Sequence, residues 1–163
     1  MNNHTQIRIC SIKRFYSILE SLDSTAGIAA ILCTTGLVDK NNLKNIPHVL
    51  ATFADVTKPK AVAAFRIEKA LRIKRFVDSL KNTNVLYICC DSGESRSSAI
   101  AAAVLRHWQR NDMAIWNSVR FHPNPLVYRL QCKAFGCTVS RLHVFALRRH
   151  NQRVFKKQVQ KHR

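Results

Sequence analysis

The stretch "CDSGESRS", residues 90–97, places a cysteine six residues before an arginine, with a glycine between them. An apolar run, "VLYI", precedes it and an alanine-rich run follows it, so we expect a strand, a tight loop and then a helix. A helix N-terminus offers unpaired amides and a partial positive charge, and successive loop amides can enclose an anion. The sequence therefore predicts an anion-binding loop between strand and helix.

The residue types in this loop suit attack on a phosphoryl group. The field at a helix N-terminus lowers the pKa of a thiol from about 8.5 by several units, which would make Cys90 a thiolate at neutral pH. The planar fork of Arg96 can hold two phosphate oxygens and keep the phosphorus in line with the sulfur. Ser97 can donate its hydroxyl hydrogen to the thiolate, and Gly93 gives the turn its conformational freedom. The pattern predicts nucleophilic catalysis by Cys90.

Residues 90–97 fit C-x-x-G-x-x-R-[S/T] and resemble the phosphate-binding loop of the cysteine-dependent protein tyrosine and dual-specificity phosphatases. The resemblance implies that Cys90 attacks the phosphoryl group and that Arg96 holds its oxygens. A later segment, "FHPNPLVYRL", is similar to one in small bacterial and phage-type phosphatase-like proteins. The resemblance implies that residues of the loop bind the phosphate, namely Asp91, Ser92, Gly93, Glu94, Ser95, Arg96 and Ser97. We expect no metal and no organic cofactor, because the cradle already neutralises the phosphoryl charge.

The family also uses an aspartate on a preceding loop to protonate the leaving oxygen. Between residue 40 and the loop the candidates are Asp55, Glu68 and Asp78. Glu68 and Asp78 fall within an expected helix, where they are explained as solvated charges. Asp55 follows the apolar run "HVLATF", at the end of a strand, where α/β sheets place their sites. We therefore expect Asp55 to be the general acid, with a role in a turn or a helix cap as the alternative.

Two features depart from the family pattern. Cys89 occupies the position at which most members have a histidine, and alternation along a strand predicts that its side chain faces away from the pocket. Asp91 and Glu94 add negative charge to a loop that should bind an anion, so we expect their side chains to point outward. Both departures leave a binding module without catalytic activity as an alternative.

Apolar runs of strand length occur at residues 7–12, 29–33, 49–53 and 85–89. Between the last two, apolar residues at helical spacing predict an amphipathic helix with Phe65, Ile73, Phe76, Val77 and Leu80 on one face. We expect three further helices in residues 96–108, 124–136 and 140–163, the last with Leu142, Phe145 and Val154 on its apolar face. The fold class is α/β, with a mainly parallel central sheet flanked by helices and a basic C-terminal helix.

The chain has 163 residues, of which 47% are hydrophobic, and this length suits one domain with a real core. We expect a phosphatase-like domain in residues 1–140 and a basic, partly packed helix or tail in residues 141–163. The six cysteines are interpreted as free thiols, and their spacing predicts no metal site. With neither a secretory signal nor a transmembrane segment expected, the predicted location is cytoplasmic.

The formal net charge is +18, and no acidic residue follows Asp112. A field of this sign requires an anionic partner. The sequence favours a protein tyrosine or dual-specificity phosphatase acting on a phosphorylated protein or another phosphomonoester. An RNA 5′-phosphatase of the same chemistry is the alternative enzyme, and the basic C-terminal third makes nucleic acid or an anionic surface a candidate partner.

Overall fold

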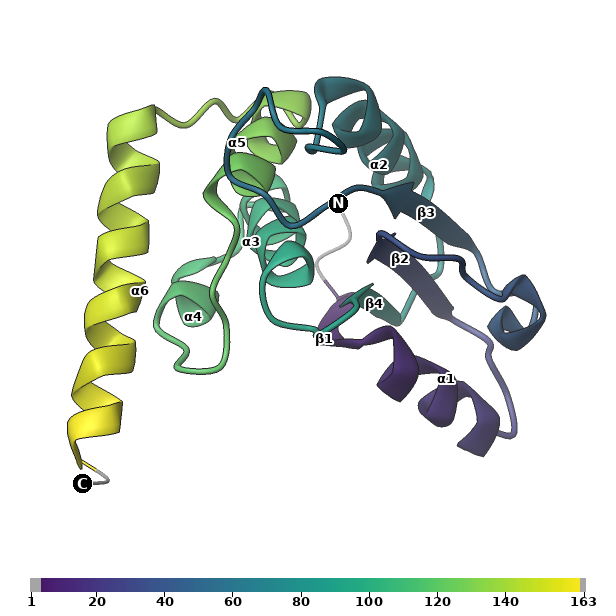
Figure 1. Cartoon of the computed structure of the whole chain (residues 1–163). Coiled ribbons are helices and arrows are strands. Elements are labelled where there is room, and N and C mark those ends of the chain that lie inside the picture. The colour runs from purple at the N-terminus through teal and green to yellow at the C-terminus, as the bar shows by residue number, and fades with distance from the viewer. Residues whose placement is uncertain (1–3, 162–163) are drawn as a thin grey trace.

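The computed structural model describes residues 4–161 and contains a four-stranded sheet in which every pairing is parallel (Figure 1). The strands are β1 (Gln6–Ser11), β2 (Ile28–Thr34), β3 (His48–Thr52) and β4 (Val85–Cys90). Their order in the sheet is β1-β4-β2-β3, so β4 lies between β1 and β2. The predicted α/β class and all four predicted strands are confirmed.

Helices cover both faces of the sheet (Figure 1). Helix α1 (Ile12–Ser21) and the 3-10 helix η1 (Lys40–Leu43) pack on one face around Phe15, Leu19 and Leu43. The other face carries α2 (Ile67–Ser79), α3 (Arg96–His107) and α5 (Pro125–Ala134), and α4 (Met113–Trp116) joins the same core. The continuous apolar sequences of β2 and β4 follow from this burial on both sides.

Two element boundaries differ from the sequence prediction. The strand expected to reach Ile12 ends at Ser11, because the Ser11 hydroxyl accepts a hydrogen bond from the Arg14 amide and caps α1. Helix α2 begins at Ile67, so Phe65 lies before it, although its ring is buried against Phe53.

Helix α6 (Arg141–Lys161) packs along α4 and α5 at the side of the molecule away from the sheet (Figure 1). The predicted apolar face of this helix is wrong: Leu142 is 77% exposed and Phe145 is 60% exposed. The buried face instead carries Val144, Leu147 and Asn151. The amide of Asn151 donates to the carbonyls of residues 116, 118 and 121, each at 3.0 Å. Asn151 therefore fixes the position of α6, and the spacing of apolar residues in the sequence does not reveal that a polar residue does so.

Residues 162–163 of the expected C-terminal helix lie outside the described residues. Across residues 4–161, none of the helices combines the length and the apolar composition that crossing a bilayer requires.

Candidate active site

The carboxyl ends of the parallel strands meet at one edge of the sheet, and the candidate site lies there. Cys90 is the last residue of β4, and Thr34 is the last residue of β2. Phe53 and Asp55 follow the end of β3. Strand order places β4 in the interior of the sheet, so the loop after Cys90 is flanked by the ends of its neighbours.

The Cys90 thiol lies beneath this loop and is 1% exposed. The Gly93 amide donates a hydrogen bond to Sγ at 3.2 Å, and the Ser97 hydroxyl lies 3.1 Å from Sγ. Burial alone would raise the pKa of Cys90, but hydrogen bonds from the Ser97 hydroxyl and from the amides of Ser97, Gly93 and Glu94 outweigh it. The pKa of Cys90 is therefore held below the ordinary thiol value, which favours a nucleophilic thiolate.

Gly93 is required by both its backbone and its surroundings. Its φ of +77° lies in the left-handed region, which residues with a Cβ rarely adopt. A Cβ at this position would lie 2.5 Å from the Cys10 carbonyl carbon and 2.5 Å from the Ser11 amide nitrogen. The loop is thus packed directly against the end of β1, which holds its amides over the sulfur.

Arg96 begins α3, and its side chain, which is 7% exposed, lies between the loop and the segment after β3. Nη1 donates to the Phe53 carbonyl at 3.0 Å, and Nη2 donates to Asp91 Oδ2 at 2.6 Å. Nε is buried and has no hydrogen-bond partner among the described residues. A guanidinium has five N–H donors in a fixed plane, and a buried donor left unpaired is costly. Arg96 therefore keeps one buried donor that no described residue satisfies.

The two acidic residues of the loop behave differently. Glu94 is exposed, and its main contacts are made by its backbone carbonyl, which accepts from the His122 amide at 3.1 Å. Asp91 is also exposed, with 46% of its side chain accessible, but its carboxylate accepts from Arg96 and, at 2.8 Å, from the Thr34 hydroxyl. Burial would raise the pKa of Asp91, but the bonds from Arg96 and Thr34 outweigh it and lower that pKa. Asp91 thus orients Arg96 while offsetting part of its charge.

Asp55 is exposed and is joined to the loop by hydrogen bonds. Its Oδ1 accepts from the Ser95 hydroxyl at 3.0 Å and from Asn124 Nδ2 at 2.6 Å. Its Oδ2 has no hydrogen-bond partner within residues 4–161. The structure thus brings Asp55 to the loop, whereas Asp78 is bonded to Lys74 on α2 and to His107 on α3.

Asn124 is a residue of the site to which the sequence interpretation gave no role. It is 2% exposed, and its Oδ1 caps α5 by accepting from the amides of Leu126 and Val127. Its side-chain Nδ2 donates to Asp55, and its backbone amide donates to the Ser95 carbonyl at 3.3 Å. An Asn directly before Pro125 is a recognisable helix start, but only the fold shows that its amide faces Asp55.

Cys89 lies on the opposite face of the sheet from Cys90, in the core formed with α1. Its sulfur is 3.7 Å from that of Cys10, which is its register partner on β1. Burial raises the pKa of Cys89, so its thiol stays neutral. Cys89, which stands where most of the resembled phosphatases have a histidine, therefore makes no side-chain hydrogen bond that could lower the pKa of Cys90.

No protein-family model and no curated protein matches the chain. Among solved structures, the chain is similar to a crystal structure of PTPMT1, with 12% sequence identity, a TM-score of 0.44 and coverage of 95% of both chains. It is also similar to a structure of PTPMT1 in complex with PI(5)P, with 13% identity, a TM-score of 0.45 and coverage of 94% of both chains. Similarity at this level is weak, so the functional inference below depends on the residues of this chain.

Proposed function

We propose that the chain is a cysteine-dependent phosphatase of the protein tyrosine and dual-specificity superfamily. The observation that carries the proposal is a thiol of lowered pKa beneath loop amides, next to a buried arginine whose Nε has no partner. An oxyanion in the loop would receive the amides and Nε together, which would hold a phosphorus atom above Sγ. The narrower resemblance to small bacterial and phage-type members stays a prediction.

In the first step, the Cys90 thiolate forms an S–P bond as the bond from phosphorus to the leaving oxygen breaks. Asp55 gives its proton to that oxygen, so the product leaves as a neutral alcohol or phenol. In the second step, the Asp55 carboxylate takes a proton from water, the water oxygen bonds to phosphorus, and the S–P bond breaks. The Ser97 hydroxyl, 3.1 Å from Sγ, stabilises the thiolate that departs.

The loop suits a phosphomonoester as substrate, which a phosphorylated protein and an RNA with a 5′-phosphate would both present. A phosphate-binding module without catalysis is the second candidate, because the ion pair between Asp91 and Arg96 occupies part of the arginine fork. In that case the loop would bind phosphate without turnover. Both candidates predict that the loop binds phosphate, and only the phosphatase predicts that a phosphate ester is hydrolysed.

The test is hydrolysis of an aryl phosphate by the wild type and by Cys90→Ser and Asp55→Asn, across mildly acidic to neutral pH. We expect no turnover with Cys90→Ser, and with Asp55→Asn a rate loss that grows as the leaving group becomes poorer. Equal activity of the wild type and Cys90→Ser would refute the cysteine mechanism. An inactive wild type that still binds phosphate would support the binding module.

A further inference from the structure

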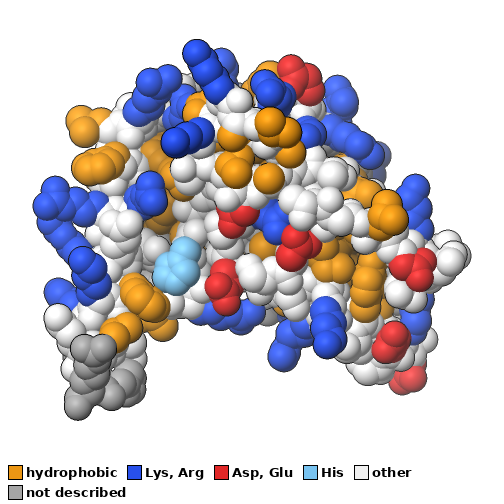
Figure 2. Space-filling model, viewed as in Figure 1, with side chains coloured by type: hydrophobic (Ala, Val, Ile, Leu, Met, Phe, Trp, Pro, Cys, Tyr) orange, Lys and Arg blue, Asp and Glu red, His pale blue; other side chains and the backbone are white. Residues whose placement is uncertain are grey.

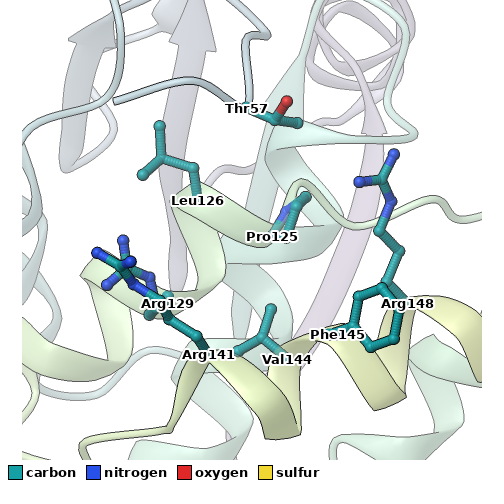
Figure 3. Close-up of a pocket in the computed structure, with 8 residues that line it drawn as sticks. All are labelled: Thr57, Pro125, Leu126, Arg129, Arg141, Val144, Phe145 and Arg148. Carbon is teal, nitrogen blue, oxygen red and sulfur yellow. The ribbon is translucent and has the colours of Figure 1, made fainter. Parts of the chain in front are cut away.

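Helices α5 and α6 enclose a pocket of about 170 Å³ beside the candidate active site (Figure 3). Its apolar wall includes Leu126 and Val144, and three arginines surround it. In Figure 3 the guanidinium groups of Arg129 and Arg141 lie at one end of the pocket, and that of Arg148 lies at the other end, near Thr57. We call this pocket with its arginines the α5–α6 groove.

The arginines of the groove are paired with no carboxylate in residues 4–161. None of Arg129, Arg141 and Arg148 makes an ion pair or a side-chain hydrogen bond to another residue within 4–161. No acidic residue follows Asp112 in the sequence, and Figure 2 shows Lys and Arg side chains along the outer edge of α6. Several guanidinium groups gathered without a carboxylate produce a positive potential that attracts anions.

The groove is continuous with the candidate active site. Thr57, Pro125 and Arg148 line the groove and also a second pocket, of about 290 Å³, which contains Asp55 and Ser95. A ligand with one phosphate in the Cys90 loop can therefore extend past Asp55 into the groove. The ligand that fits must carry further negative charge beyond its first phosphate.

Cationic, aromatic and neutral polar side chains follow one another along the same side of α6. Arg141, Phe145, Arg148, Gln152 and Phe155 follow one another at steps of four and three residues, which places them on one helical face. We call this set the α6 stripe; it extends over about 21 Å at 1.5 Å per residue. Phe145 is 60% exposed. Phe155 is 42% exposed and its ring meets that of His122 edge-on, with centroids 5.1 Å apart, so both rings keep exposed area on which a base can stack.

We propose that the α6 stripe and the α5–α6 groove bind a single-stranded nucleic acid whose terminal phosphate enters the Cys90 loop. The proposal rests on the phosphatase function above and names its substrate class. Backbone phosphates pair with the arginines, and bases stack on Phe145 and Phe155, which is how proteins bind single strands without sequence preference. A nucleic-acid strand carries a phosphate at every nucleotide and can pair with arginines spread along the helix, whereas a peptide with one phosphoryl group cannot.

The spacing along α6 disfavours an anionic membrane as the ligand. A helix lying in a membrane interface presents one continuous apolar face. On the α6 stripe, Phe145 and Phe155 are separated by Arg148 and Gln152. Val159 follows Phe155 on this face, but Arg148 and Gln152 still interrupt its apolar surface, which suits stacking on separate bases better than insertion among acyl chains.

The test measures binding of a short fluorescent poly(U) RNA, with a 5′-phosphate or a 5′-hydroxyl, to the full chain carrying Cys90→Ser. The variants are the pair Arg129→Gln with Arg141→Gln and, separately, Phe145→Ala. The matched control is the pair Arg72→Gln with Arg75→Gln, which removes equal charge from exposed positions of α2. We expect about tenfold weaker binding for the groove pair and for Phe145→Ala, and less than about twofold for the control.

The salt dependence gives a second readout. Loss of two phosphate contacts should reduce the slope of log affinity against log salt by about 1.4 for a single strand. The 5′-phosphate should strengthen binding to the unaltered groove. In the chain with an intact Cys90, the groove pair should hydrolyse an aryl phosphate at the wild-type rate, because these arginines do not contact the reacting atoms.

The outcomes separate this inference from the proposed function. If the wild type hydrolyses aryl phosphate but the groove pair and the α2 pair weaken RNA binding equally, the inference is wrong and the phosphatase proposal stands. If RNA binding requires the groove but no phosphate ester is cleaved, the phosphatase proposal is wrong and the binding surface stands. Binding of anionic vesicles or of a doubly phosphorylated peptide through the same arginines, without RNA binding, would overturn the inference.

Discussion

Replacing Gly93 by alanine should displace the loop that covers Cys90. The new Cβ would lie 2.5 Å from atoms of Cys10 and Ser11, so the loop must move by about 0.9 Å to reach an ordinary 3.4 Å contact. A displacement near 1 Å at a reacting centre costs about 100-fold in rate. The same shift would weaken the hydrogen bond from the Gly93 amide to Sγ and raise the pKa of Cys90.

The stability cost of Gly93→Ala has two parts. The left-handed backbone costs about 1–2 kcal/mol for a residue with a Cβ, and the overlap with β1 adds about 1–3 kcal/mol. Gly136→Ala is the matched control, because its φ is +80° and no atom lies within 4 Å of its added Cβ. It should therefore lose only the backbone part.

The assay is kcat/KM on an aryl phosphate together with the free energy of unfolding from urea titration. We expect Gly93→Ala to lose about 100-fold in kcat/KM, and Gly136→Ala to keep wild-type activity. Equal stability loss and unchanged activity in the two variants would refute the reasoning, since it would show that contact between the loop and β1 does not position the site.

Three further predictions follow from the contacts of the site and of α6. Asn124→Ala should lower the free energy of unfolding by about 1–2 kcal/mol through loss of the α5 cap, and should slow alkyl phosphate hydrolysis more than aryl phosphate hydrolysis; an equal effect on both substrates would limit Asn124 to a structural role. Ser97→Ala should raise the pH midpoint of Cys90 alkylation, because the Ser97 hydroxyl favours the thiolate; an unshifted midpoint would contradict that role of Ser97. Because the pKa of Cys90 is lower in the folded state, the wild type should also gain stability over Cys90→Ser as pH rises toward the ordinary thiol value near 8.5. Leu147→Ala should cost about 2–4 kcal/mol of unfolding free energy and Leu142→Ala less than about 0.5 kcal/mol; equal costs, measured by urea titration, would contradict the observed packing of α6.

The parts of the fold that the sequence predicts are those set by local pattern. The continuous apolar runs of β2 and β4 require burial on both faces, and they predict a parallel sheet covered by helices. The spacing from Cys90 to Arg96, after a strand and before a helix, predicts where a phosphate-binding loop forms. Helix α1 escaped prediction, although Ser11 before a helical sequence is an N-cap signal, because the apolar strand was extended through Ile12.

The remaining features depend on partners distant in the sequence. Asp91 meets Thr34 only because β2 and β4 are neighbours in the sheet. Asn124 meets Asp55 because the start of α5 lies beside the end of β3, 69 residues away in the chain. Asn151 lies on the buried face of α6 because its side-chain amide hydrogen-bonds three carbonyls, although the apolar periodicity predicts a different buried face. Burial of a polar group depends on tertiary hydrogen bonds, which no local pattern encodes.

The measurement that tests the central claim most directly is the capture of a phosphoenzyme. The Asp55→Asn variant, in which water activation is slowed, is mixed with an aryl phosphate, quenched rapidly and mapped by peptide mass spectrometry. The mechanism predicts a phosphoryl group on the sulfur of Cys90 and none in the double variant that also carries Cys90→Ser. Steady hydrolysis with the phosphoryl group on another residue, or with no phosphoenzyme and full activity in Cys90→Ser, would contradict it.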